Sequence, residues 1–145
     1  MVDLSVLEIP FGSDEQKESV KLRFRVLRQP LGLNFDAEDL AAEFIDYHVA
    51  AFHDHHLVGV LLLRPLDAGT LKMRQVAVDF DWQGTGVGKS LVKFSEQFGR
   101  EKGFGKIELH ARENAVPFYL SLGYALEGEL FYEVGIPHRK MHKKI

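Results

Sequence analysis

The sequence predicts a mixed α/β domain in which an antiparallel meander of strands leads into one strand–helix–strand crossover. Three apolar runs lie between residues 47 and 78 and are separated by short polar turns, which is the pattern of antiparallel strands. The third run continues through a glycine-rich turn into an amphipathic helix and a further strand, and such a crossover makes its two strands parallel. The chain has 145 residues, of which 46% are hydrophobic, as expected for one globular core. We therefore expect a single domain over residues 1–145.

The first part of the chain predicts one strand and two helices. Residues 4–9 alternate weakly between apolar and polar side chains, which favours a strand. Residues 14–28 carry apolar side chains at helical spacing, and Pro30 would end this helix because proline cannot donate a backbone hydrogen bond. Asp36 can cap a second helix. The apolar side of that second helix is expected to carry Leu40, Ala41 and Phe44.

The middle of the chain predicts the meander. Residues 47–52 and 57–63 flank the polar turn Asp54-His55-His56, a pattern typical of a β-hairpin. The run over 57–63 is apolar throughout, so we expect both of its faces to be covered. A turn that contains Gly69 then leads to the third strand, over residues 71–78.

The last part of the chain alternates helices and strands. The helix after the glycine-rich turn carries an apolar stripe at positions i, i+4, i+7 and i+11, and Glu96 lies off this stripe with other charged residues. Residues 106–111 alternate strictly and predict a strand, after which Asn114 opens a short helix. Residues 125–133 and 138–143 predict two final strands. The expected element order is βααβββαβαββ. The apolar stripe consists of Val87, Leu91, Phe94 and Phe98.

Composition and charge narrow the class of partner. The formal net charge is −3, so no sequence-wide attraction to nucleic acid or to an anionic membrane is expected. The chain has no cysteine, which excludes disulfides and thiolate chemistry and is compatible with a reducing cytoplasm. The longest apolar run, residues 57–63, is far shorter than a membrane helix needs. We expect a cytoplasmic protein with no membrane segment.

The glycine-rich turn WQGTGVGKSL, residues 82–91, is suited to hold phosphate. Glycines let a backbone approach a pyrophosphate closely, and a helix N-terminus supplies free N–H groups and a partial positive charge. A nucleotide-triphosphate loop would need a further glycine five residues before Gly88, where Gln83 stands. The later apolar strand also ends without an acidic magnesium ligand. The turn therefore fits a triphosphate loop poorly.

Two segments together resemble the GNAT superfamily of N-acetyltransferases. Gln83-Gly84-Thr85-Gly86-Val87-Gly88 resembles the Gln/Arg-x-x-Gly-x-Gly/Ala signature of that superfamily. About thirty residues later, Asn114-Ala115-Val116-Pro117-Phe118-Tyr119 with Leu122-Gly123-Tyr124 resembles its second motif. The element order is also that of the GNAT fold. The resemblance therefore implies the acyl-CoA N-acyltransferase fold with two splayed central strands.

The resemblance implies that acetyl-CoA lies between the strands at 71–78 and 106–111 as a cosubstrate. The backbone around Val76 and Val78 would bond the pantetheine arm and the thioester carbonyl, and the turn would hold the pyrophosphate. The implied coenzyme-binding residues are Val76, Ala77, Val78, Gln83, Gly84, Thr85, Gly86, Val87, Gly88, Lys89, Asn114, Phe118 and Tyr119.

The resemblance also assigns catalytic roles. Tyr119 matches the tyrosine that would protonate the departing coenzyme thiolate, although its helical spacing would also suit a core aromatic. A base is needed because a lysine-like amine is almost fully protonated at neutral pH. His110, at the end of a splayed strand, is our candidate for this base, with Glu113 and His138 as alternatives. Other polar residues that could orient the substrate are Arg74 and Gln75.

Other interpretations of the chain remain open. His53, His55 and His56 could suggest a metal, but a hairpin turn explains them better, and we expect no metal site. The chain could be a non-catalytic acyl-CoA-binding module that senses the coenzyme or regulates a partner. The acceptor amine, a small molecule or a peptide, has no signature in the sequence. A monomer and a homodimer are both compatible with it.

Overall fold

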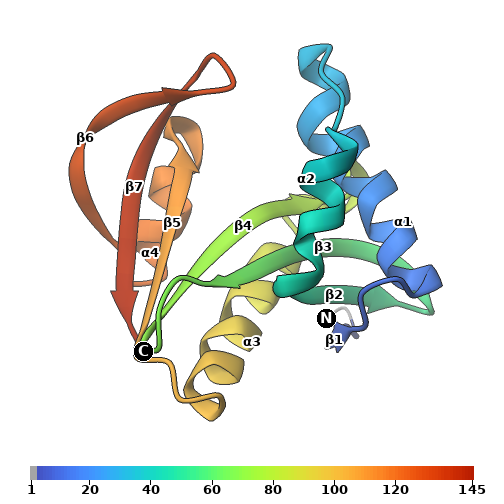
Figure 1. Cartoon of the computed structure of the whole chain (residues 1–145), viewed down its shortest axis with the longest axis horizontal. Helices are drawn as coiled ribbons and strands as arrows, with labels where there is room; N and C mark the ends of the chain where they lie inside the picture. The colour runs from blue at the N-terminus through green and yellow to red at the C-terminus, as the bar shows by residue number, and fades with distance from the viewer. Residues whose placement is uncertain (1–2) are drawn as a thin grey trace.

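Seven strands form one mixed sheet in the computed structural model, which describes residues 3–145 (Figure 1). The order across the sheet is β1-β2-β3-β4-β5-β7-β6. Neighbouring strands are antiparallel except β4 and β5, which are parallel across the predicted crossover. The strands are β1 (Ser5–Ile9), β2 (Tyr47–His53), β3 (His56–Pro65), β4 (Thr70–Val78), β5 (Lys106–Arg112), β6 (Ala125–Glu133) and β7 (Ile136–Lys144).

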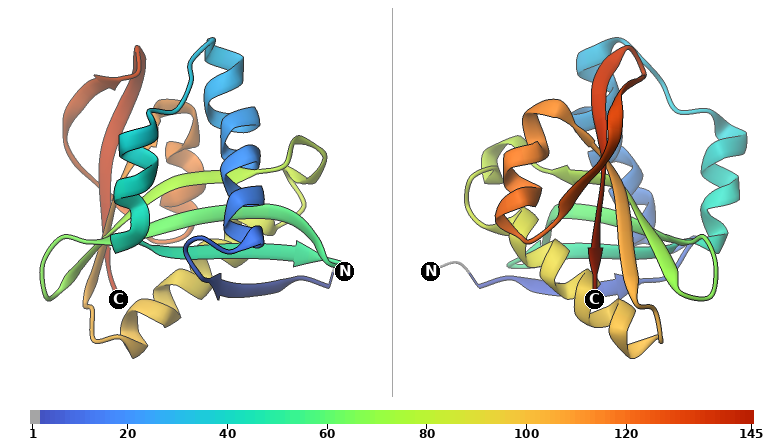
Figure 2. Two further views of the ribbon diagram at one scale, coloured as in Figure 1. Left: turned by 45° about the vertical axis from the view of Figure 1, so that its right-hand side comes forward. Right: turned by 90° about the vertical axis from the view of Figure 1, so that its left-hand side faces the viewer.

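Helices cover both faces of the sheet, and the element order predicted from the sequence is confirmed (Figure 2). One face, beneath α3 and α4, carries the larger apolar cluster, which includes Leu91, Leu109 and Tyr119. The other face packs a smaller cluster around Leu22 and Ala77 beneath α1. The α-helices are α1 (Asp14–Arg23), α2 (Ala37–Ala42), α3 (Val87–Glu101) and α4 (Val116–Ser121).

The central hairpin forms as the sequence predicts. Asp54 and His55 both have positive φ, 47° and 65°, so they make a two-residue turn whose twist suits a hairpin. β3 is buried at six successive positions, Val58–Leu63, which confirms that both of its faces are covered. Among the described residues, no three His, Asp or Glu side chains gather closely enough to hold a metal ion. Within residues 3–145, no helix has both the length and the apolar character needed to cross a membrane.

The first helix is less regular than its apolar spacing predicts. It is α-helical over Asp14–Arg23, continues as a π-helical turn over Phe24–Arg28, and ends in a 3₁₀ turn that contains Pro30. In the π turn, the N–H of Gln29 donates to the carbonyl of Phe24, five residues back. Such turns often occur at functional sites. Here the turn carries Arg28 to the edge of the cavity described below.

The second helix is capped by Asp36 as predicted, but its expected apolar side is wrong. The Asp36 carboxylate accepts from the N–H groups of Glu38 and Asp39. Phe44 is nevertheless 68% exposed, whereas Glu43 is buried. Glu43 begins the 3₁₀ turn that follows α2, and it is buried because its carboxylate pairs with Arg23 of α1.

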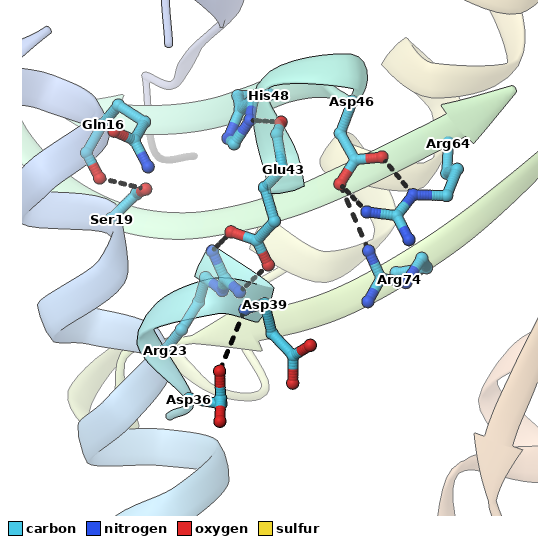
Figure 3. Close-up of polar contacts among 10 residues, drawn as sticks. All are labelled: Gln16, Ser19, Arg23, Asp36, Asp39, Glu43, Asp46, His48, Arg64 and Arg74. Carbon is cyan, nitrogen blue, oxygen red and sulfur yellow. Dashed lines mark hydrogen bonds and ion pairs between the residues drawn. The ribbon is translucent and has the colours of Figure 1, made fainter. Parts of the chain in front are cut away.

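The Arg23–Glu43 pair is the main polar link between α1 and the segment after α2 (Figure 3). Two hydrogen bonds of 2.9 and 2.6 Å join the guanidinium to the carboxylate, and both side chains are almost completely buried. His48 of β2 donates from Nε2 to the Glu43 carbonyl at 2.8 Å. The Arg23 guanidinium also lies 4.9 Å from the centre of the Phe35 ring. These contacts fix the helical layer on its face of the sheet.

A second buried carboxylate joins three segments of the same region. Asp46, whose side chain is fully buried, accepts from Arg64 of β3 at 2.6 and 3.1 Å. It also accepts from Arg74 of β4 at 3.2 Å (Figure 3). One carboxylate thus neutralises only one of the two arginine charges, so one positive charge beside β4 is left in excess.

Glu96 shows a similar departure from the helical pattern. It lies off the apolar stripe of α3, yet it is buried. Its carboxylate accepts from the Tyr124 hydroxyl at 3.0 Å and from the Lys143 ammonium at 3.0 Å. These partners come from the segment after α4 and from β7, so contacts remote in sequence bury a residue that local periodicity places outside the core.

The Arg23–Glu43 link predicts a large stability effect. Glu43→Gln should lower the free energy of unfolding by about 3–5 kcal/mol, because it leaves the buried Arg23 charge without its counter-ion. Urea denaturation of the two proteins measures this difference. Glu18→Gln, the same change in the exposed Lys21–Glu18 pair, should cost less than about 1 kcal/mol. Equal costs for the two substitutions would show that the buried pair does not hold the helices in place.

Candidate active site

The strands β4 and β5 pair only at their beginnings. Their parallel register runs from Thr70 with Lys106 to Met73 with Leu109, after which the two strands separate (Figure 1). β4 continues to Val78 and β5 to Arg112 without pairing to one another. A cavity of about 730 Å³ lies between them. The splayed central strands that the GNAT resemblance implies are therefore present.

A bulge in β4 accompanies this separation. Across the β3–β4 ladder, Val60 faces Ala77 and Leu62 faces Arg74, so β4 has one residue more than β3 in this interval. Gln75 takes up the extra length with a positive φ of 54°. Bulges re-aim side chains and bend the strand that carries them. The sequence pattern of residues 71–78 did not predict this bulge.

The backbone after the bulge presents alternate residues to the cavity. Asp79 donates its N–H to Val58 of β3 at 2.9 Å. Successive residues of a strand direct their backbone groups to opposite sides, so Ala77 also faces β3, while Val76 and Val78 face the gap. The Val78 carbonyl accepts from the Gln83 side chain at 3.1 Å. Val76 and Val78 thus line the cavity, but Ala77 does not.

The glycine-rich turn places the N-terminus of α3 at the mouth of the cavity. Gly86 is the N-cap residue of α3, with φ of 96°, a left-handed conformation that favours glycine. The first bond within the helix runs from Ser90 N–H to the Gly86 carbonyl at 3.0 Å. The N–H groups of Val87, Gly88 and Lys89 therefore have no partner inside the helix. Such free N–H groups at a helix end are the kind of donors that bind phosphate.

A close approach of α3 to β3 fixes the position of that N-terminus. Gly59 of β3 lies directly beneath the helix, because a Cβ there would come within 2.7 Å of Val87 Cγ1 and 2.9 Å of Leu91 Cδ1. Val87 is fully buried and does not line the cavity, although the resemblance implies that it binds the coenzyme.

Most of the residues implied by the resemblance meet at this cavity, and a few do not. Thr85 lies on the surface of the turn, and its hydroxyl donates to the Trp82 carbonyl. Asn114 is exposed in the 3₁₀ turn before α4, outside the lining, as is the alternative base Glu113. The predicted coenzyme-binding and catalytic residues that line the cavity are Val76, Val78, Gln83, Gly84, Gly86, Gly88, Lys89, His110, Phe118 and Tyr119.

Tyr119 lies on the wall of the cavity with its ring in the core. It is 6% exposed and packs against the rings of Phe118 and Tyr124. Burial raises the pKa of the Tyr119 phenol well above its ordinary value near 10. The phenol therefore remains protonated, and able to donate, throughout the working range of pH.

A second group of titratable residues lies on the β5 side of the cavity. His110 Nδ1 is 2.5 Å from a Glu133 oxygen at the end of β6. Its ring packs edge-on against Phe131. His138 lines the same region, with Nε2 3.9 Å from the other Glu133 oxygen. Since a carboxylate can only accept, His110 donates from Nδ1, and in the neutral ring Nε2 is then the proton acceptor.

Glu133 had no signal in the sequence. Its position depends on β7 pairing with β5 in the register of His110 with Lys140 and Arg112 with His138. The β6–β7 hairpin then brings Glu133 back over the end of β5. Local pattern could predict both strands, but not their register.

Cationic side chains also line the cavity. For Arg28, Lys72, Arg74 and Arg112 the pKa is lowered, in each case chiefly by burial. The positive charges of neighbouring arginines lower the pKa of Arg28, Lys72 and Arg74 further. Glu133 is the one carboxylate in the lining formed by the described residues.

Comparison with known proteins places this geometry in a family. Residues 30–145 match the family described as the acetyltransferase (GNAT) domain. The chain belongs to this GNAT acetyltransferase family. YjcF of Bacillus subtilis (strain 168), named as an N-acetyltransferase, is 32% identical over 133 residues, covering 91% of this chain and 94% of YjcF.

Two further similarities bear on length and fold. YyaT of Bacillus subtilis (strain 168) is 33% identical over 98 residues, and the match covers 68% of this chain and 66% of YyaT. The chain thus spans just under two thirds of that relative. A crystal structure from Lactobacillus plantarum matches with a TM-score of 0.84 at 22% identity, covering 97% of both chains. It has the same GNAT fold.

The geometry of the turn predicts the effect of removing its N-cap glycine. Gly86→Ala should weaken acetyl-CoA binding about tenfold or more, because strain at the N-cap displaces the free N–H groups of α3. Isothermal titration calorimetry with acetyl-CoA measures this effect. Gly103→Ala is a matched control at the other end of α3, since Gly103 has φ of 90° and similarly open surroundings.

Both substitutions should lower the free energy of unfolding by a similar amount, about 1–2 kcal/mol. Only Gly86→Ala should change the affinity for acetyl-CoA. An unchanged affinity in Gly86→Ala would contradict the assignment of this helix end to the coenzyme.

Proposed function

We propose that this protein transfers an acetyl group from acetyl-CoA to a primary amine by direct attack of the amine on the thioester. The observation that carries the proposal is the cavity between β4 and β5, with free N–H groups of α3 at its mouth and the protonated Tyr119 in its wall. Two structural neighbours, at 18% and 16% identity, are an aminoglycoside 6′-N-acetyltransferase complexed with coenzyme A and a GNAT acetyltransferase from Elizabethkingia anophelis with acetyl-CoA bound. These neighbours support the same coenzyme here.

The coenzyme would bind along a path from α3 to Tyr119. The N–H groups of Gly88 and Lys89 would hold its diphosphate, where the helix end favours negative charge. The backbone groups of Val76 and Val78 would bond its extended arm as a further strand would. Bound there, acetyl-CoA supplies the activated carbonyl carbon that the amine attacks.

Tyr119 would act as the general acid. When the amine nitrogen has bonded to the carbonyl carbon and the carbon–sulfur bond breaks, the sulfur needs a proton. Tyr119 retains its proton because burial disfavours the phenolate. Tyr119 and the neighbouring Phe118 both line the cavity in which the coenzyme arm would lie.

His110 and Glu133 would remove the proton of the amine. A lysine-like amine is about one part in a thousand neutral at pH 7, which costs roughly 4–5 kcal/mol before attack. Glu133 accepts from His110 Nδ1 at 2.5 Å and so orients the ring. The free Nε2 would take the proton from the amine, directly or through water.

Tyr119→Phe should lower kcat about a hundredfold to ten-thousandfold while leaving the affinity for acetyl-CoA unchanged, because only the donated proton is lost. Coenzyme release in steady state and calorimetric binding measure the two quantities. Tyr124→Phe also removes a buried hydroxyl, from the adjacent ring, and should leave kcat within about threefold of the wild type. Full turnover in Tyr119→Phe would exclude the phenol as the acid.

His110→Gln should lower kcat/KM for the amine about a hundredfold or more at pH 7, and Glu133→Gln should lower it less, because the ring stays in place but is less well oriented. A more basic solution should partly restore His110→Gln, since more of the amine is then neutral. A pH–rate profile for the three proteins checks both statements. If His110→Gln keeps the wild-type profile, the base lies elsewhere.

A further inference from the structure

Positively charged side chains gather on the face of the cavity that lies opposite α3. We call this face the acceptor side, because the amine acceptor would bind there. Along β5, Leu109 and Ala111 are buried in the cluster beneath α3, so His110 and Arg112 point to the opposite face. Along β4, Leu71 and Met73 are buried in that same cluster, which places Lys72 and Arg74 on the opposite face too. These cations therefore lie across the sheet from the phosphate-binding end of α3.

Of the five cations in the lining, which include Lys89 at the end of α3, only Arg74 has a carboxylate partner among the described residues. Within residues 3–145, no Asp or Glu oxygen lies within 4.0 Å of Arg28, Lys72 or Arg112. By contrast, Arg23 in the same helical layer is paired with the carboxylate of Glu43. Half-buried charges without partners are costly to the fold, so their retention at a cavity points to a ligand of opposite charge.

Arg28 and Arg112 form a pair although they are far apart in the sequence. Their guanidinium groups contact the same atom, the Leu27 carbonyl oxygen, at 3.5 and 3.3 Å. Arg28 is further positioned by the Phe35 ring, whose centre lies 5.0 Å from its guanidinium carbon. Two guanidinium groups held side by side present the paired N–H donors that bind a carboxylate or a phosphate.

The remaining polar groups suit the other end of such a molecule. Glu133 can attract an ammonium group, and it already contacts the proposed base His110. In the bulge of β4, the Gln75 side-chain oxygen is buried and, among the described residues, has no hydrogen-bond partner. It lines the same cavity and can accept from an N–H of the ligand.

We propose, building on the proposed acetyl transfer, that the acceptor is a small primary amine that also carries a carboxylate or phosphate group. Arg28 and Arg112 bind this anion, and Glu133 and His110 receive the amine. Lys72 adds to the positive potential. Polyamines, which carry only positive charge, are poor acceptors because this potential repels them.

The test compares matched acceptors that differ in the anion. β-Alanine is paired with propylamine, and phosphoethanolamine with ethanolamine, while spermidine serves as a polycation. Coenzyme release with acetyl-CoA gives kcat/KM for each. The anionic member of at least one pair should be favoured about tenfold to a hundredfold. The pair that shows the larger preference identifies carboxylate or phosphate as the anion.

Three variants locate the anion site. Arg28→Gln and Arg112→Gln should each remove most of the preference for the anionic member while the KM for acetyl-CoA stays unchanged. Arg100→Gln, at the far end of α3 and outside the cavity, should keep the preference of the wild type. Equal or better turnover of propylamine, ethanolamine or spermidine by the wild type would overturn the inference, as would a preference that survives both cavity substitutions.

A binding measurement separates this inference from the proposed function. If the wild type acetylates none of these amines, the acetyl-transfer proposal is contradicted for these acceptors. Calorimetric titration of β-alanine and phosphoethanolamine, with coenzyme A present, still decides the anion site. Binding that is lost in Arg112→Gln but kept in Arg100→Gln supports the site, and no binding by the wild type overturns it.

Discussion

The separation of β4 from β5 is the constraint on which the rest of the molecule depends. Two parallel strands that pair at Thr70–Met73 and then separate leave backbone groups unpaired in the middle of a sheet. Buried backbone groups need partners, so the gap must be filled by water or by a ligand. The bulge at Gln75 and the approach of α3 over Gly59 hold the gap open and direct the helix end towards it. The GNAT fold thus provides a site because two neighbouring strands of its sheet stop pairing and leave a gap between them.

The two faces of this gap differ in charge, and they are built from different groups: backbone on one face and side chains on the other. On the α3 face, where we propose that the coenzyme binds, the lining consists of free N–H groups and glycine backbone, and Lys89 is its one charged side chain among the described residues. On the opposite face, arginines from the π turn and from β4 and β5 line the cavity together with Glu133 of the β6–β7 hairpin. The Arg23–Glu43 and Asp46 contacts hold the helical layer that brings Arg28 there. In our proposal, the fold therefore separates a coenzyme site made of backbone groups from an acceptor site made of side chains.

The sequence predicts well whatever is encoded locally. The strand and helix order, the hairpin at Asp54 and the capping by Asp36 follow from turn chemistry and periodicity. The glycine turn and Tyr119 could be recognised from two short motifs. Glu96 and Phe44 could not be placed, because remote partners decide which side of a helix is buried. Glu133 and the Arg28–Arg112 pair depend on strand register and on a π turn, and neither has a local signature.

A crystal structure of the protein with acetyl-CoA tests the central claim most directly. We predict the diphosphate against the N–H groups of Gly88 and Lys89, the arm of the coenzyme between β4 and β5, and its sulfur beside Tyr119. Coenzyme bound at another surface, or a gap between the two strands closed by side chains at saturating coenzyme, would contradict the account.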